Sequence, residues 1–470
     1  MTRRLLTVLA AVALCAGPVA LAQEGTAPAQ TTTQPAAASP NDQAEATPPA
    51  ETGPIHLSLE EAITGVMEAN PGLKALGHRS AAAAKNASAA GRKRWGNLDA
   101  FFTYTRYNDD RLVRPMSWEM ISEAGGFAGL PWDRNQRHYG LTYSIPLYLG
   151  GQLSNNIKIA NFESQKAEAL VEGTRWQLRF NATSLYTAAQ TLDRVEGSLG
   201  ELVKSLEKTK ERLDLMVESG KRPEVDRLKV VEQLEDARAQ RESVRADRVR
   251  VGALLLALMG KDPSLGIVVD PLPDRTPGPT MTPEELRTAA LENSTIRRAR
   301  FTYDESESQV KVRTASFIPK VFASGNVTQN AAPSVDDPLD SWQVSVGVVV
   351  PILHGTSRFE ELAAAKEQRS AAEASVQNTQ LRVQSQLEEA LARFKAAQAE
   401  LKAARARVAA GTEAARIEQI RYDTGASTIE DLLRAQARKQ AAEASLAKAR
   451  GGLITAAERI NSIVEKEAMK

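Results

Sequence analysis

Two stretches of this sequence, YSIPLYLGGQL at residues 143–153 and VVVPILHGTSR at residues 348–358, carry the same order of apolar residues, proline and glycine. Their prolines and first glycines are separated by the same 205 residues. A short apolar run that ends in Pro and Gly before a long helical pattern indicates a turn from a strand into a helix. We predict two such strand-to-helix turns, marked by Pro146, Gly150, Pro351 and Gly355.

The repeat extends in both directions from these turns. Downstream, the offset of 205 residues also relates Gly220 to Gly425 and Asp226 to Asp431. Upstream, EEAITGVMEANPGL, which contains Asn70, resembles PEELRTAALENSTI, which contains Asn293, at an offset of 223. The 18 extra residues of the first copy therefore lie between Asn70 and the first turn. We place them in the loop around residues 108–137, because surface loops tolerate insertions, opposite a shorter loop at 330–340.

The start of the chain predicts export. MTRRLLTVLAAVALCAGPVALAQ has two arginines, an apolar core and a small-residue end, which is the pattern of a cleaved secretory signal. Leu14 precedes Cys15 where a lipoprotein signal needs a small residue, so we do not expect lipidation. If Cys15 leaves with the signal, the mature chain has no cysteine and no disulfide.

The repeat, the signal and the composition divide the chain into five segments. We expect a signal peptide at 1–22, a disordered leader rich in Pro, Ala and Thr at 23–54, a first structural repeat at 55–261, a Pro-rich crossover linker at 262–282 and a second structural repeat at 283–470.

Composition excludes several functions. The formal charge of +1 falls to about −1 without the signal arginines, so bulk charge does not predict nucleic-acid binding. The four histidines, His56, His78, His138 and His354, are scattered and make no metal-ligand spacing. No phosphate-binding loop, nucleophile motif or acid pair stands in a suitable context. We therefore expect no catalytic residues, no cofactor and no enzyme activity.

Strand pairs are predicted in each copy. We expect strands at 98–107 and 137–147 in the first copy and at 320–328 and 342–351 in the second. Apolar and polar residues alternate along them, as in Trp342, Val344 and Val346 against Gln343 and Ser345. Alternation over about ten residues is typical of membrane β-barrels, although soluble β-sandwich strands show it too.

Very long helices follow the strand pairs. Apolar residues recur every seven positions in both copies, at Leu178, Leu185, Leu192, Leu199, Leu206 and Leu213, and at Leu387, Phe394, Leu401, Val408, Ala415 and Tyr422. A Pro-free run of about 65 residues makes a helix of roughly 100 Å, and heptad spacing indicates a coiled-coil seam. Heptads alone also fit a secreted periplasmic coiled-coil structural protein. The intervening strand pairs favour a channel, in which several chains share one barrel because open sheet edges do not occur in lipid.

At this point the sequence resembles the TolC-type outer-membrane efflux proteins over roughly residues 55–465. The segments that carry the resemblance are LSLEEAITGVMEANPGL, the paired IPLYLGG and VPILHGT, LLALMGKDP and RYDTGASTIEDLLRAQ. The resemblance implies a mainly α fold with a membrane β-barrel part. Long antiparallel coiled-coil helices would form a trimeric α-barrel in the periplasm, and four strands per chain would contribute to a shared twelve-stranded barrel in the outer membrane.

The resemblance also implies the partners and the role of the helical reversals. The expected partners are two further chains, outer-membrane lipid, a periplasmic adaptor (membrane fusion) protein and an inner-membrane pump. The adaptor-docking tips would be Gly220, Lys221, Gly425 and Ala426. The channel would serve as the passive exit duct of a tripartite efflux or type I secretion system. The exported substrate is not specified, because selection in such systems occurs at the pump.

Three residues near the tips are expected to form the periplasmic aperture and its latch. By resemblance, Asp431 matches an aspartate of a carboxylate ring, and Tyr422 and Asp226 match a hydrogen-bonded pair that holds the closed state. Two positions depart from the family pattern, since Ser427 replaces a basic residue and Arg434 replaces an acidic one. The residues by themselves also fit a structural role, because glycine tolerates the left-handed backbone of a reversal and a carboxylate is favoured in the first helical turn.

Overall fold

The computed structural model describes residues 53–272, 276–352 and 356–469, which belong to one unit, Thr52–Lys470. The predicted signal peptide with Cys15, and the leader as far as residue 52, lie outside the described residues. The predicted turn residue Gly355 and the neighbouring His354 also lie outside them.

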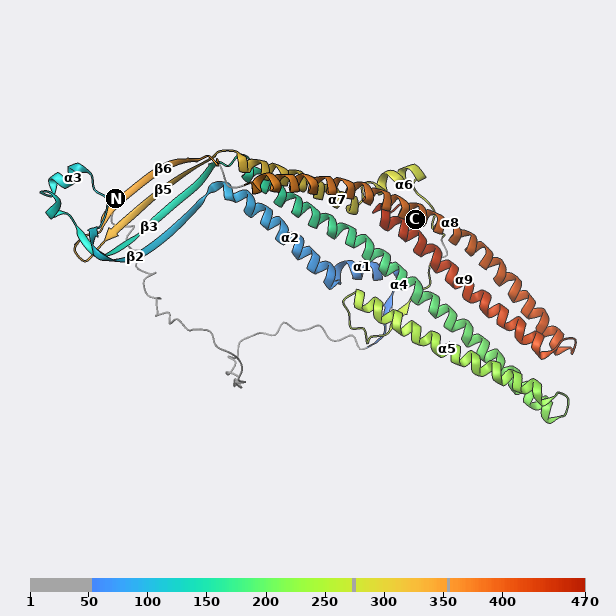
Figure 1. Ribbon diagram of the computed structural model, residues 1–470. Coiled ribbons are helices and arrows are strands. Elements are labelled where there is room, and N and C mark those ends of the chain that lie inside the picture. The colour runs from blue at the N-terminus through green and yellow to red at the C-terminus, as the bar shows by residue number, and fades with distance from the viewer. Residues whose placement is uncertain (1–52, 273–275, 353–355, 470) are drawn as a thin grey trace, which may run out of the picture. The chain divides into compact units, whose positions relative to one another are not determined.

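Four long helices form two antiparallel hairpins (Figure 1). Helices α4 (Gln152–Glu218) and α8 (Ser357–Asp423) have 67 residues each, which corresponds to roughly 100 Å. Helices α5 (Glu224–Leu258) and α9 (Ile429–Val464) return from the two reversals. The predicted long helical runs are therefore confirmed. Within the described residues, no helix is both long and apolar enough to cross a bilayer.

Shorter helices pack along the hairpins and repeat the same capping chemistry in both copies. They are α1 (Leu59–Ala69) with α2 (Pro71–Arg92), and α6 (Pro283–Ala290) with α7 (Ser294–Thr314). The matched Asn70 and Asn293 cap α2 and α7 by accepting from the amides of Leu73 and Ile296, at 2.8 and 3.0 Å. Each amide group also donates to a carbonyl of a long helix, Leu258 or Ile463, which explains why the repeat retains asparagine here.

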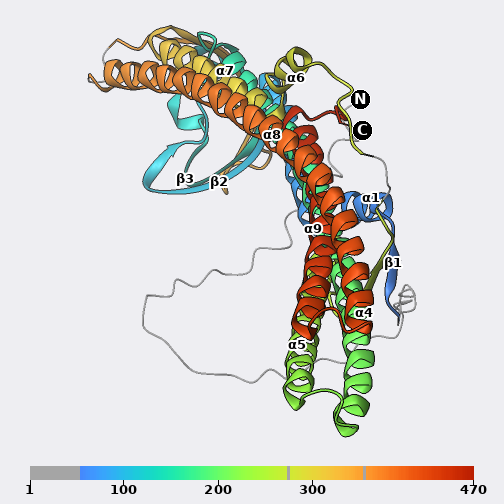
Figure 2. The same cartoon turned by 90° about the vertical axis from the view of Figure 1, so that its right-hand side faces the viewer.

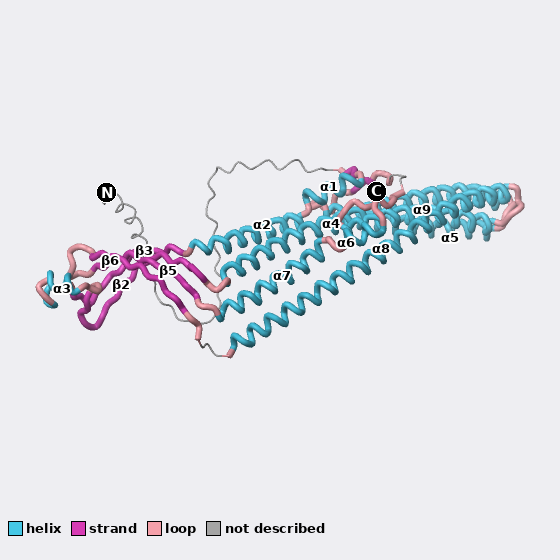
Figure 3. The backbone as a smooth tube through the Cα atoms, turned by 90° about the horizontal axis from the view of Figure 1, so that it is seen from above, coloured by secondary structure: helices cyan, strands magenta, loops and turns pink. Residues whose placement is uncertain are grey.

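One antiparallel sheet contains the four predicted strands. They are β2 (Asn97–Leu112), β3 (Trp132–Tyr148), β5 (Lys320–Ala331) and β6 (Leu339–Val349), in the order β2-β3-β5-β6. Figure 3 shows them beyond the ends of α2, α4, α7 and α8. The central pairing of β3 with β5 joins the two copies and was not predicted from the sequence. Strands β2 and β6 are left as open edges.

The insertion of the first copy lies in the connection between β2 and β3, as predicted. Residues 113–131 include the short helix α3 (Trp118–Glu123), whereas β5 and β6 are joined by residues 332–338. The inserted loop is anchored by the buried Val113 and Leu130. The Trp132 indole also donates to the Phe127 carbonyl at 3.0 Å.

A small parallel sheet fastens the start of the described chain to the segment predicted as a linker. Strand β1 (Ile55–Leu57) pairs with β4 (Ile267–Val269), which lies inside the predicted 262–282 linker. The buried Tyr186 hydroxyl of α4 donates to the carbonyls of Leu57 and Asp270 at 3.1 and 2.9 Å. Burial raises the pKa of Tyr186 to about 12, so the Tyr186 hydroxyl keeps its proton for these hydrogen bonds at neutral pH.

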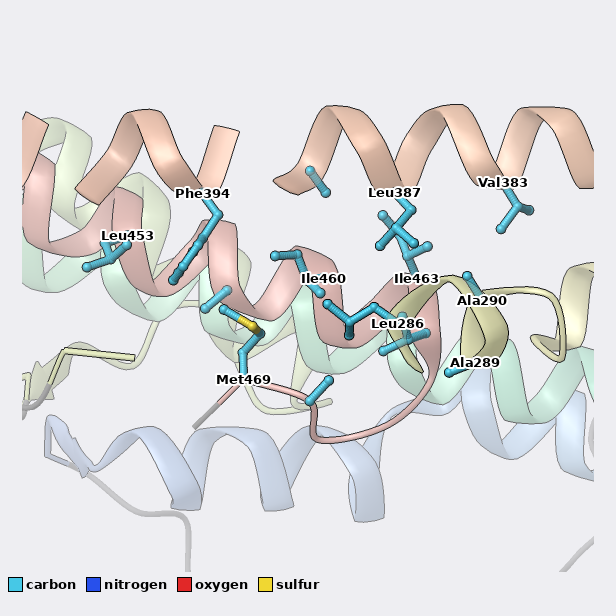
Figure 4. Packing of buried hydrophobic residues seen from close by; sticks show 14 of the residues in the cluster. Leu286, Ala289, Ala290, Val383, Leu387, Phe394, Leu453, Ile460, Ile463 and Met469 are labelled. Atoms are coloured by element: carbon cyan, nitrogen blue, oxygen red, sulfur yellow. The ribbon is translucent and has the colours of Figure 1, made fainter. Parts of the chain in front are cut away.

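The largest apolar core joins α6, α8 and α9 to the last described residues (Figure 4). Leu387 and Phe394 of the predicted heptad series are buried there against Leu453 and Ile460. In α9, next to this core, the buried side chain of Asn461 accepts from the amides of Ala468 and Met469, both at 2.9 Å. The chain after α9 therefore folds back onto the helix instead of leaving it.

Candidate functional site

The two helical reversals have the same backbone geometry. Gly220 and Gly425 have φ values of +68° and +76°, in the left-handed region. After each glycine, the next amide bonds back to the helix end: Lys221 N donates to Met216 O at 2.8 Å, and Ala426 N donates to Arg421 O at 2.7 Å. These are Schellman turns, which require a positive φ at the glycine position. The structural role predicted for both glycines is confirmed.

The returning helices begin differently, although both carry an aspartate in the first turn. At α9, Thr428 Oγ1 accepts from the Asp431 amide at 3.2 Å and Asp431 Oδ2 accepts from the Thr428 amide at 3.4 Å, which completes a capping box. Thr428 Oγ1 also donates to Asp431 Oδ2 at 2.8 Å. These hydrogen bonds from Thr428 lower the pKa of Asp431. At α5 the cap position is Pro223, which has no side-chain cap, and Asp226 lies in the first turn without that partner.

Within the described residues no hydrogen bond joins Tyr422 to Asp226, the pair that was expected to form the latch. Tyr422 is 5 % exposed and its hydroxyl has no hydrogen-bond partner. Arg222 interacts with both residues instead: its guanidinium lies 5.1 Å from the Tyr422 ring centroid, and its Nη1 lies 4.0 Å from Asp226 Oδ2. The Arg222 guanidinium contacts both the aromatic face of Tyr422 and the carboxylate of Asp226. It therefore links these two residues without the Tyr422 hydroxyl.

Sequence comparison of the two tips contained a signal for Arg222 that the prediction missed. Arg222 stands two residues after Gly220, and Ser427 stands two residues after Gly425. The basic residue lacking at the second tip is therefore present at the equivalent position of the first. Only the packing of the tips reveals that this arginine reaches Tyr422 of the other hairpin.

Both hairpin tips are joined within one chain. Side chains of all four long helices form a common apolar cluster, which includes Leu206, Leu213, Val230, Leu234, Tyr422 and Leu432. Two ion pairs cross between the hairpins, Arg212 to Asp423 at 2.7 Å and Lys229 to Glu430 at 3.6 Å. Figure 2 shows these ends of the hairpins next to each other. The ion pairs are solvent-exposed and each is worth about 1 kcal/mol or less, so the apolar cluster provides most of the attachment.

The sheet has two chemically different faces. One face carries exposed apolar side chains from all four strands, including Leu98, Phe102, Leu141, Tyr143, Val327, Trp342, Val344, Val346 and Val348. The register places them in adjacent rows, as in Leu141 opposite Val327 and Val327 opposite Trp342. The other face is mainly polar, with Ser324 and Ser345 joined at 2.8 Å. Exposed apolar surface of this extent indicates contact with lipid or another protein.

Three of the four predicted turn residues are described, and their positions differ. Pro146 lies within β3, next to a register shift of the β3–β5 pairing. Gly150 has a φ of +62°, and a Cβ there would lie 2.8 Å from Ile318 Cβ, so this turn has no room for a side chain. Pro351 stands two residues after Val349, the last residue of β6. Within the described ranges, no cluster of three or more His, Cys, Asp or Glu could hold a metal ion.

Comparison with known proteins gives relatives in sequence and in structure. A family model described as outer membrane efflux protein matches residues 63–261 and 286–464. Nodulation protein T of Rhizobium leguminosarum bv. trifolii is 27% identical over 157 residues, 33% of this chain, and the match spans about a third of that relative (34%).

Solved outer-membrane proteins share the fold at low sequence identity. The chain is similar to VceC of Vibrio cholerae (18% identity, TM-score 0.73, covering 87% of this chain and 96% of that one). It is also similar to the CmeC outer membrane channel of Campylobacter jejuni (16%, 0.75, 87% and 86%) and to the open state of the MtrE outer membrane channel of Neisseria gonorrhoeae (17%, 0.71, 87% and 89%). Since the family model covers most of the sequence and the duplicated helix and strand pattern agrees with these structures, the chain belongs to the outer membrane efflux protein family, the TolC-type channels.

Proposed function

We propose that three copies of the chain form a closed membrane barrel that continues into a helical tunnel, the passive exit duct of a tripartite efflux or type I secretion system. The observation that carries this proposal is the sheet, which has one exposed apolar face and two open edges, β2 and β6. Unpaired backbone groups at such edges are too costly in lipid. Pairing each β6 with the β2 of the next copy removes every edge.

The number of copies follows from the interior that an exit duct needs. Two copies of the sheet would give eight strands, and an eight-stranded barrel has an interior that side chains fill. Three copies give twelve strands and leave room for a lumen lined by the polar face. The apolar row from Trp342 to Val350 spans about 27 Å along the strand, and a tilt of about 40° reduces this to roughly 21 Å, close to the apolar band of known barrels.

The tips are proposed as the docking sites of a periplasmic adaptor that connects the duct to an inner-membrane pump. Gly220, Lys221, Gly425 and Ala426 are all exposed at the reversals. Asp226, Tyr422 and Asp431 are proposed to line or control the aperture there, with Arg222 added as the residue that contacts two of them. The heptad pattern also fits a secreted coiled-coil structural protein. That alternative does not explain why the sheet exposes an apolar face.

Substitutions on opposite faces of β6 test the membrane assignment. Val346→Arg places a charge on the apolar face and is expected to cost about 2–4 kcal/mol per chain near the bilayer midplane. Gln343→Arg, on the polar face of the same strand, serves as its matched control. We expect heat-modifiable trimers in outer-membrane fractions and channels in planar bilayers from Gln343→Arg but not from Val346→Arg. Equal assembly of both variants, or a monomeric mass of the wild type in mild detergent, would refute the shared barrel.

A further inference from the structure

Two hollows, together called the groove here, lie between α8 and α9. Their volumes are about 370 Å³ nearest the tip and about 540 Å³ further along. The α9 residues that line the groove recur at spacings of three and four, so they occupy one face of the helix: Asp431, Arg434, Arg438, Ala441, Ser445, Lys448 and Gly452. The charged residues of this row are Asp431, Arg434, Arg438 and Lys448, and the α8 side of the lining adds Glu400 and Glu418. Any excess of positive charge therefore depends on which of these side chains are paired with residues outside the lining.

Basic residues outnumber acidic ones in the α8–α9 hairpin but not in the α4–α5 hairpin. Between residues 400 and 452 there are ten Lys and Arg against seven Asp and Glu, whereas the first tip, residues 201–238, has nine against ten. The opposing charges therefore nearly cancel in α4 and α5 but not in α8 and α9.

Each carboxylate of residues 400–452 has an ion-pair or hydrogen-bond partner. Their partners are Arg407 for Glu400, Arg416 for Glu413, Arg421 for Glu418, Arg212 for Asp423, Arg434 for Glu430, Thr428 for Asp431 and Lys439 for Glu443. By contrast, Arg438 and Lys448 have no ion pair within the part of the chain that the structure describes. Two uncompensated cations therefore remain in the groove lining, about 15 Å apart along α9.

We propose that this groove makes the periplasmic mouth of the duct selective for anions, through Arg434, Arg438 and Lys448. The inference rests on the proposed trimer, in which the groove that contains Asp431 faces the aperture, so that three copies surround one passage. Rings of basic side chains favour anions in narrow pores, and low-dielectric walls focus their field. The exported compounds favoured by this mouth would be small molecules with a net negative charge.

Ion selectivity of the reconstituted full-length protein tests the proposal. In planar bilayers under a KCl gradient, we expect chloride to permeate better than potassium at about 0.1 M salt. The preference should decline towards 1 M, where the screening length falls from about 10 to 3 Å. The double variant Arg434→Gln/Arg438→Gln should lower the chloride-to-potassium permeability ratio at least several-fold.

The matched control is Lys402→Gln/Arg405→Gln, which removes the same charge from α8 residues that do not line either hollow. It should leave the permeability ratio near the wild-type value. A cation-selective wild type, or an equal fall in both double variants, would overturn the role of the groove while leaving the channel function intact. Failure of the wild type to conduct at all would refute the proposed duct and the inference together.

Discussion

Arg222 provides the most direct test of how the tips hold together. Its guanidinium stacks over Tyr422 with a centroid distance of 5.1 Å and approaches Asp226 at 4.0 Å, whereas the Tyr422 hydroxyl is buried without a partner. Arg222→Ala removes both contacts. Tyr422→Phe removes only the hydroxyl and preserves the aromatic face. The two variants therefore distinguish tips that are held together by Arg222 from tips that are held together by a hydrogen bond between Tyr422 and Asp226.

The expected magnitude follows from the two contacts of Arg222. A cation over an aromatic ring contributes about 0.5–1 kcal/mol near solvent, and a partly exposed ion pair contributes up to about 1 kcal/mol. Together they stabilise the joined tips by about 0.5–2 kcal/mol per chain. Three copies that open together would sum to about 1.5–6 kcal/mol if additive, which is at least a tenfold shift in the ratio of open to closed channels. Loss of an unpartnered hydroxyl should change this ratio little.

Single-channel recording in planar bilayers, with trimer yield measured in parallel, checks this prediction. We expect Arg222→Ala to raise the open fraction or the conductance, and Tyr422→Phe to resemble the wild type. Arg227→Ala is the matched control, because Arg227 lies at the same tip but pairs with Glu224. If Tyr422→Phe raised the open fraction or the conductance and Arg222→Ala did not, the role of Arg222 would be refuted and the hydrogen-bonded latch supported.

Two further predictions concern the tips and the C-terminal fold-back. Replacing Gly220 and Gly425 by valine forces a β-branched residue into a positive φ, so adaptor cross-linking and export should be lost while trimers remain; normal cross-linking would contradict docking at the tips. Burial raises the pKa of Glu465, against donation from Ser294 and the nearby Arg297, with Glu172 adding to the increase. Its contribution to stability is therefore complete below a pH of about 4.5 and is lost as pH rises through the folded-state pKa. Thermal unfolding between pH 4 and 8 should show this component in the wild type and not in Glu465→Gln, and identical pH profiles would contradict it.

Local patterns in the sequence predicted most of the elements correctly. Heptad and two-residue periodicities follow from the geometry of a single helix or strand, so the 67-residue helices and the four strands could be predicted without knowledge of their neighbours. The same applies to Gly220 and Gly425, because a Schellman turn needs a positive φ wherever it occurs. The internal repeat also located the insertion, since a length difference between two copies must lie between their matched segments.

Contacts between distant segments were decided by the tertiary structure alone. The β3–β5 pairing joins residues almost 200 positions apart, such as Leu141 and Val327, and no local pattern specifies which strands become neighbours. The position of Arg222 over Tyr422 likewise depends on how two hairpins pack, and it replaced the hydrogen bond expected from the sequence. Periodicity determines which face of an element is apolar, but the partner that covers that face is chosen by packing across the whole chain.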